Sequence, residues 1–149
     1  MKIKLSVSEE CYERIRDELT AAGFEIDDDA EFVLAQRGRF KDYLPVLNGN
    51  GERVHVKMDD IIFIESFGHS VEVHTTGNVY KTTDRLYQLT AALDPEKFLR
   101  VSNSVIIAKG KIKHMKPTFS MKFVLLMSDG SYVDVTRSYY SSFKESMGL

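Results

Sequence analysis

The sequence has a single cysteine, Cys11, no tryptophan and only three prolines among its 149 residues. One cysteine cannot form a disulfide within the chain, which excludes a disulfide-stapled secreted fold. No apolar run approaches the roughly 18 residues that a membrane helix needs, and the N-terminal stretch lacks the apolar segment of a signal peptide. We therefore expect a cytoplasmic protein with no membrane partner.

Motifs for catalysis or metal binding are also missing. The four histidines (His55, His69, His74 and His114) lie on separate segments and match no zinc spacing. Residues 68–72 resemble the start of a nucleophile elbow, but Glu72 stands where the second glycine is needed and the following residues read as a strand. No glycine pattern would cradle a phosphate. We expect no enzyme activity, no catalytic residues, no metal, no cofactor and no small-molecule substrate.

Charge is unevenly distributed along the chain. The net charge is −2, yet residues 1–50 carry seven bases against eleven acids and residues 51–149 carry thirteen against eleven. Between Lys97 and Ser128 there are seven Lys or Arg residues and no Asp or Glu. Such a segment suits a phosphate backbone, although a basic run is also typical of an ordinary solvated face.

The first 45 residues predict a small β-α-β-β unit. Residues 2–7 alternate polar and apolar side chains, as a half-buried strand does. Ser8 can cap a helix that stops at Gly23, and residues 24–26 and 31–35 read as two short strands. We assign this unit to dimerisation or regulation.

From residue 46 to residue 149 the pattern predicts a mainly β, α+β domain. Short apolar runs alternate with turn signals, which is typical of antiparallel hairpins, and Asp129-Gly130 joins strands expected at 123–127 and 132–136. One helix is expected between a Thr83-Asp84 cap and Pro95, and another short helix at 138–144.

Three polar sites lie at expected strand ends: Gly68-His69-Ser70, Ser102-Asn103-Ser104 and Thr136-Arg137-Ser138. Arg can donate two hydrogen bonds to guanine, Asn can bind adenine through two bonds, and Ser suits phosphate. In the alternative interpretation, His69 and Asn103 satisfy turn backbone groups and Arg137 pairs with a neighbour such as Asp134.

Five segments of this part of the chain form a recognisable series: 60–66 (DIIFIES), 71–75 (VEVHT), the helix around Leu86 to Leu93, 98–104 (FLRVSNS) and 133–139 (VDVTRSY). In their order and spacing, residues 50–146 resemble the LytTR DNA-binding domain family of bacterial transcription regulators. The resemblance implies antiparallel strands in short stacked sheets, with one or two short helices, whose loops enter successive major grooves of double-stranded DNA. Family members commonly bind paired sites as dimers and bend the DNA.

The resemblance also implies roles for individual residues. His69, Asn103 and Arg137 match the loop residues that face bases, whereas Ser70, Ser104 and Lys109 are candidates for phosphate contacts. Ser102 and Ala108 depart from the family, which often has an imidazole and an Asn at these positions.

The family's usual N-terminal neighbour is a phosphate-receiving domain, which needs about a hundred or more residues. The acidic triplet Asp27-Asp28-Asp29 therefore reads as a solvated turn of the short N-terminal unit. The resulting hypothesis is a DNA-binding transcription regulator that acts as a homodimer, at least on DNA. The alternative is a protein-interaction module that keeps the LytTR-like scaffold without binding DNA.

Overall fold

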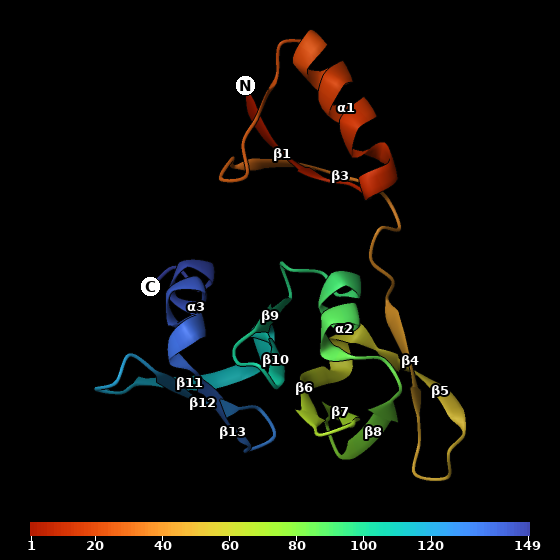
Figure 1. Cartoon of the computed structure of the whole chain (residues 1–149), viewed down its shortest axis with the longest axis vertical. Coiled ribbons are helices and arrows are strands. Elements are labelled where there is room, and N and C mark those ends of the chain that lie inside the picture. The colour runs from red at the N-terminus through yellow and green to blue at the C-terminus, as the bar shows by residue number, and fades with distance from the viewer. The chain divides into compact units, whose positions relative to one another are not determined.

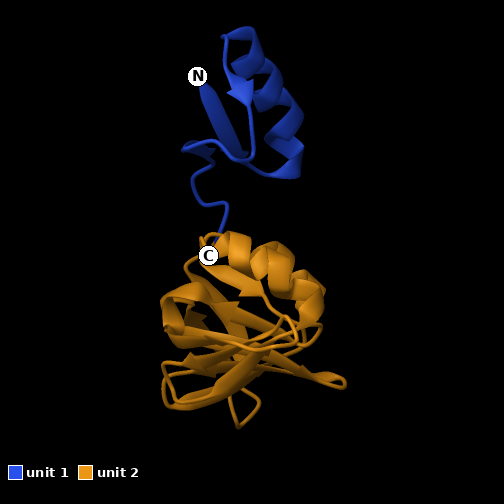
Figure 2. Ribbon diagram, turned by 90° about the vertical axis from the view of Figure 1, so that its left-hand side faces the viewer, with its two compact units in different colours: residues 1–40 blue, residues 41–149 orange.

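The computed structural model describes all 149 residues, which form two compact units at residues 1–40 and 41–149 (Figure 2). The division falls between Phe40 and Lys41 rather than after residue 45. The reason is strand pairing, since Tyr43 and Leu44 already face Lys57 and Val56 in a hairpin of the second unit.

The first unit is a three-stranded parallel sheet with a helix on one face (Figure 1). Its elements are β1 (Lys2–Ser6), α1 (Glu9–Ala21), β2 (Glu25–Ile26) and β3 (Phe32–Ala35), and the strand order is β2-β1-β3. Leu5 and Val7 are buried on the face that α1 covers. Ser8 occupies the N-cap position without a side-chain cap, and its N–H instead donates to Gln36 Oε1 at 2.8 Å.

The second unit contains two antiparallel sheets, which confirms the mainly β fold class. The larger sheet has the order β5-β4-β8-β7-β6-β10-β9, and the smaller one the order β11-β12-β13. The strands of the larger sheet are β4 (Tyr43–Leu47), β5 (Arg53–Lys57), β6 (Ile61–Phe67), β7 (Ser70–Thr75), β8 (Asn78–Thr82), β9 (Phe98–Arg100) and β10 (Val105–Ala108). Those of the smaller sheet are β11 (Ile112–Pro117), β12 (Phe123–Met127) and β13 (Tyr132–Val135).

Two short α-helices and three 3₁₀ turns complete this unit (Figure 1). The helices are α2 (Leu86–Ala92) and α3 (Tyr140–Ser146), and the turns are η1 (Met58–Asp60), η2 (Lys109–Lys111) and η3 (Arg137–Tyr139). None of the helices combines the length and apolar character that crossing a bilayer requires.

The larger sheet is buried on both faces at β6 and β10. Residues 61–64 of β6 are all at most 4% exposed, which explains why this stretch is a continuous apolar run instead of an alternating one. On one face, Leu89 of α2 packs in a core with Ile64 and Ile106. On the other, Phe143 of α3 and the smaller sheet form a second core with Phe63 and Ile107. These two cores hold the ends of β6 and β10 in place.

Two expectations for this unit were wrong. The strand β11 was missed, because a bulge between Ile112 and His114 shifts the alternation of polar and apolar residues. The expected Thr83-Asp84 cap does not start α2: Arg85 is the N-cap residue, and its N–H donates to Gln88 Oε1 at 2.8 Å. The Asp84 N–H bonds Thr82 Oγ1 at 3.1 Å, which places Asp84 in the turn before the helix.

Candidate functional site

The first of the three polar sites is the tight turn between β6 and β7. Phe67 faces Ser70 across the hairpin, so the two central residues are Gly68 and His69, and Ser70 opens β7. Gly68 has a φ of +56°, which a two-residue hairpin turn with glycine in its first central position requires. His69 and Ser70 are both exposed.

The second site is the loop between β9 and β10. Val101 is fully buried and Ser102 is 7% exposed, whereas Asn103 is exposed. Ser102 Oγ accepts the Ser104 N–H at 3.2 Å, which closes the turn from within. From the end of β9, the Arg100 guanidinium donates to the carbonyl oxygens of Ser102 at 3.1 Å and Asn103 at 2.7 Å. The backbone that carries Asn103 is therefore held on both sides.

The third site follows β13. Thr136 is the N-cap residue of η3, and Arg137, the first residue of that turn, is exposed. Arg137 forms no ion pair with Asp134, the neighbour that the alternative interpretation names. The turn leads directly into α3, whose Phe143 is fully buried.

Hydrogen bonds join the three loops, although they are far apart in sequence. The Ser66 N–H, beside the first turn, donates to the Ser104 carbonyl oxygen at 2.8 Å. The Thr136 N–H donates to the Val101 carbonyl oxygen at 3.0 Å, and Tyr139 Oη donates to Asn103 Oδ1 at 3.2 Å. The loop of residues 101–104 thus lies between the other two, at one end of the larger sheet.

The charge of these loops is of one sign. None of residues 66–71, 101–104 and 136–140 is acidic, while Arg100 and Arg137 contribute positive charge. The acidic residues next to these segments lie within strands and not in the loops. They are Glu65 in β6, Glu72 in β7 and Asp134 in β13. Exposed basic and amide side chains on loops that themselves carry no carboxylate can accept an anionic polymer.

Comparison with known proteins identifies the second unit. Residues 51–148 match the LytTr DNA-binding domain family. The chain belongs to this family. A transcriptional regulatory protein LytR of Staphylococcus aureus is 31% identical over 99 residues, covering 66% of this chain and 40% of the relative. A sensory transduction protein LytT of Enterococcus faecalis is 28% identical over 115 residues, covering 77% and 47%.

The fold matches as well. A solved LytTr DNA-binding domain from Bacillus cereus superposes with a TM-score of 0.69 at 23% identity, covering 73% of this chain and 99% of that domain. At this identity the likeness concerns the fold. The chain spans less than half of the length of the LytR and LytT relatives, so the activities of those whole proteins are not transferred by the match.

Lys109 lies apart from the other candidate residues of the LytTr domain. It follows the last residue of β10, at the end opposite Ser104, and its N–H donates to the Lys97 carbonyl oxygen at 2.9 Å. At about 3.3 Å per residue, the intervening strand separates Lys109 from the loop by roughly 15 Å. Lys109 instead borders a hollow of about 460 Å³, together with Lys97, Lys111 and two acidic residues.

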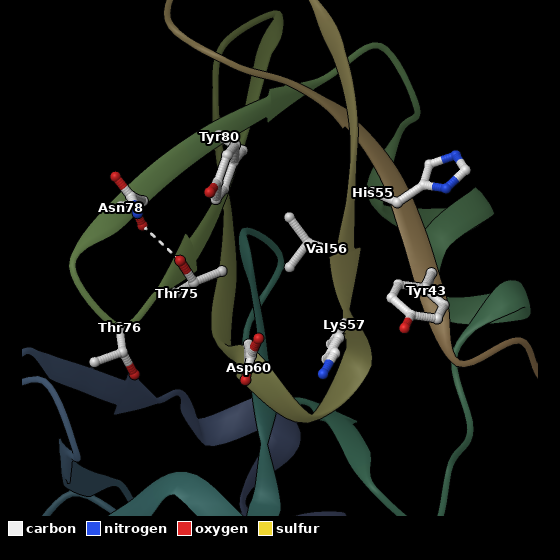
Figure 3. Close-up of a pocket in the computed structure, with 9 residues that line it drawn as sticks. All are labelled: Tyr43, His55, Val56, Lys57, Asp60, Thr75, Thr76, Asn78 and Tyr80. Carbon is white, nitrogen blue, oxygen red and sulfur yellow. Dashed lines mark hydrogen bonds between the residues drawn. The ribbon is translucent and has the colours of Figure 1, made fainter.

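A second hollow, of about 420 Å³, lies at the opposite end of β7 from the first turn (Figure 3). Its lining residues are Tyr43, His55, Val56, Lys57, Asp60, Thr75, Thr76, Asn78 and Tyr80. The Thr75 hydroxyl donates to the Asn78 carbonyl oxygen at 3.1 Å, which closes the neighbouring turn. Since β7 runs from Ser70 to Thr75, this hollow is separate from the three loops.

The three joined loops, here called the loop cluster, contain two residues that the sequence did not single out, Arg100 and Tyr139. Arg100 was placed only in the basic segment and the 98–104 match to the family, and Tyr139 only in the 133–139 match and the expected helix at 138–144, with no role at the site given to either. The only available signal for Arg100 was its position two residues before a run of three polar turn residues. For Tyr139 there was none, because its contact with Asn103 spans 36 positions in the sequence.

Proposed function

We propose that this protein is a sequence-specific double-stranded DNA-binding transcription regulator, and not an enzyme, that presents its three joined loops to the major groove. The observation that carries the proposal is the set of hydrogen bonds that holds these loops at one end of a LytTr domain. Single tight loops are narrower than the major groove, which is about 12 Å wide. The LytR relative is itself called a transcriptional regulatory protein.

In this proposal, His69, Asn103 and Arg137 read bases and Ser70 and Ser104 contact phosphates. The Arg137 guanidinium can donate to O6 and N7 of guanine, and the Asn103 amide can bond N6 and N7 of adenine. The Tyr139 hydroxyl occupies only one of the lone pairs of Asn103 Oδ1, so the amide keeps both donors and an acceptor for a base. Lys109 would contact a phosphate outside the loop cluster, and the DNA-bound form would be a homodimer.

The test is to select duplexes from a random pool with the full chain and to measure binding of the selected and a scrambled duplex at low and moderate salt. We expect binding of both at low salt and a clear preference for the selected duplex at moderate salt, because phosphate contacts weaken with salt while base contacts discriminate. Absence of binding even at low salt would contradict DNA binding and favour a protein-interaction module.

The role of Arg137 can be measured on the same duplexes. Arg137→Ala should cost about 1–3 kcal/mol on the selected site and leave binding to the scrambled duplex nearly unchanged. Arg53→Ala, at the exposed start of the distant edge strand β5, is the matched control and should change neither affinity. Equal losses on both duplexes would remove Arg137 from base reading.

A further inference from the structure

The strand β3 of the first unit is an unprotected sheet edge. The order β2-β1-β3 leaves one side of β3 without a neighbouring strand. Its residues Phe32, Val33 and Leu34 are 55%, 50% and 38% exposed, and no charged residue or proline interrupts the strand. Soluble proteins usually protect such edges with lysine, proline or a bulge, because an exposed apolar edge pairs with other strands.

The unit also has little else to stabilise it. Domains of about 40 residues or fewer usually need disulfides, a metal or oligomerisation to fold. The single cysteine excludes a disulfide within the chain, and no group of metal-binding side chains is present. The face of the sheet that α1 leaves open carries Lys2, Lys4 and Ser6 from β1, which suits contact with water. The apolar surface that lacks a partner is therefore the β3 edge.

We propose that this edge pairs with the same edge of a second copy of the chain, as an antiparallel β3–β3 ladder. The geometry is self-complementary. The Gln36 N–H donates to the Ser6 carbonyl oxygen of β1. Because backbone groups alternate in direction along a strand, those of Phe32 and Leu34 also face β1, whereas those of Val33 and Ala35 face outward. Under a two-fold axis through Leu34, Val33 of each copy faces Ala35 of the other, and their outward N–H and C=O groups bond in both directions.

Side chains and charges fit the same register. A two-fold axis perpendicular to the sheet keeps each side chain on its own face, so the two Leu34 side chains meet on the face that carries α1, with Phe32 beside them. Glu31 and Arg37, which flank the strand, are then brought opposite each other in both halves of the interface. This charge complementarity is what a second copy offers and an unrelated apolar strand would not.

This inference goes beyond DNA binding, since it concerns the free protein. The test is sedimentation of the full chain without DNA over a range of concentrations. We expect a dimer for the native chain and a monomer for Val33→Pro, which removes an outward N–H and leaves the ladder to β1 intact. The matched control Val33→Thr keeps the N–H and the β-branched shape, and should remain a dimer.

A second pair of variants tests the same interface in case Val33→Pro does not fold. Phe32→Glu places a carboxylate on a side chain that is already half exposed, so the monomer should fold, but the dimer would have to bury that charge twice. We expect the dimer dissociation constant to rise about a hundredfold or more. Val79→Glu, on an equally exposed valine of β8 in the second unit, should leave it unchanged.

A native chain that stays monomeric at all concentrations would overturn the proposal. So would dimers of Val33→Pro and Phe32→Glu, or dissociation caused by Val79→Glu while Phe32→Glu remains a dimer. None of these outcomes bears on the DNA-binding test, which is scored on the preference for the selected duplex.

Discussion

At the residue scale, the loop cluster depends on two side chains that need not touch DNA. Arg100 donates to the carbonyl oxygens of Ser102 and Asn103, and Tyr139 holds the Asn103 side chain through its hydroxyl. Fixing a loop before binding lowers the ordering entropy that association must overcome. Under the proposed function, Arg100 and Tyr139 would therefore raise affinity by positioning Asn103.

Removing the Tyr139 hydroxyl tests this positioning. Tyr139→Phe keeps the ring, which packs against the second core, and deletes the hydrogen bond to Asn103 Oδ1. We expect a loss of about 0.5–1.5 kcal/mol on the selected duplex, with binding to a scrambled duplex unchanged and the chain still folded. Tyr140→Phe, on the next residue, is the control. A similar loss of affinity from both substitutions would argue against the positioning role. So would a loss from Tyr139→Phe that is equal on the selected and the scrambled duplex.

At the scale of elements, α3 fixes the third loop because η3 runs directly into it. The Phe143 ring is fully buried, and its centroid lies 5.0 Å from that of Phe123 in β12. The Phe123 ring also stacks on Tyr140, with centroids 5.2 Å apart. This aromatic cluster joins the helix to the smaller sheet, and so holds Arg137 at the end of β13.

Truncating the centre of this cluster should destabilise the second unit. Phe143→Ala leaves a cavity where a fully buried ring was, and we expect a loss of about 3–5 kcal/mol in the free energy of unfolding, measured by urea denaturation. Phe119→Ala removes a ring that is fully exposed, and should change the free energy by less than about 0.5 kcal/mol. Similar losses from both variants would show that α3 does not anchor this core.

At the scale of the whole molecule, the two units differ in the sign of their net charge. Residues 1–40 carry six bases and ten acids, a net charge of −4, and residues 41–149 carry fourteen bases and twelve acids, a net charge of +2. An acidic first unit is repelled by a phosphate backbone, whereas the second unit is attracted to it. This distribution agrees with the proposed division of labour, in which unit 1 associates with a second copy and unit 2 binds DNA.

A substitution of Lys109 can show whether the DNA contacts the second unit beyond the three loops. If a phosphate contacts Lys109, Lys109→Ala should weaken binding to every sequence equally and reduce the slope of log K against log salt by about 0.9. Arg53→Ala, at the exposed start of the edge strand β5, is the control and should leave the slope unchanged. An unchanged slope for Lys109→Ala would confine the phosphate contacts to the loop end of β10.

Much of the fold followed from local sequence signals. The hairpin turn at Gly68, the Asp129-Gly130 turn and the fully apolar stretch of residues 61–64 each act within a few positions, so their patterns are visible in the sequence. Where a local pattern was disturbed the prediction failed. The bulge in β11 shifted the alternation, and the cap of α2 moved to Arg85 because Thr82 engages the backbone before it.

The sequence by itself therefore determined the fold class, most strands and the residue types at three exposed strand ends. Only the tertiary structure decided that these ends meet, through the bonds from Ser66 to Ser104 and from Thr136 to Val101, and that Lys109 lies elsewhere. The physical reason is distance along the chain. Turn and strand preferences act between near neighbours, whereas the meeting of the loops depends on the pairing of β6 with β10 and on the packing of a second sheet against them.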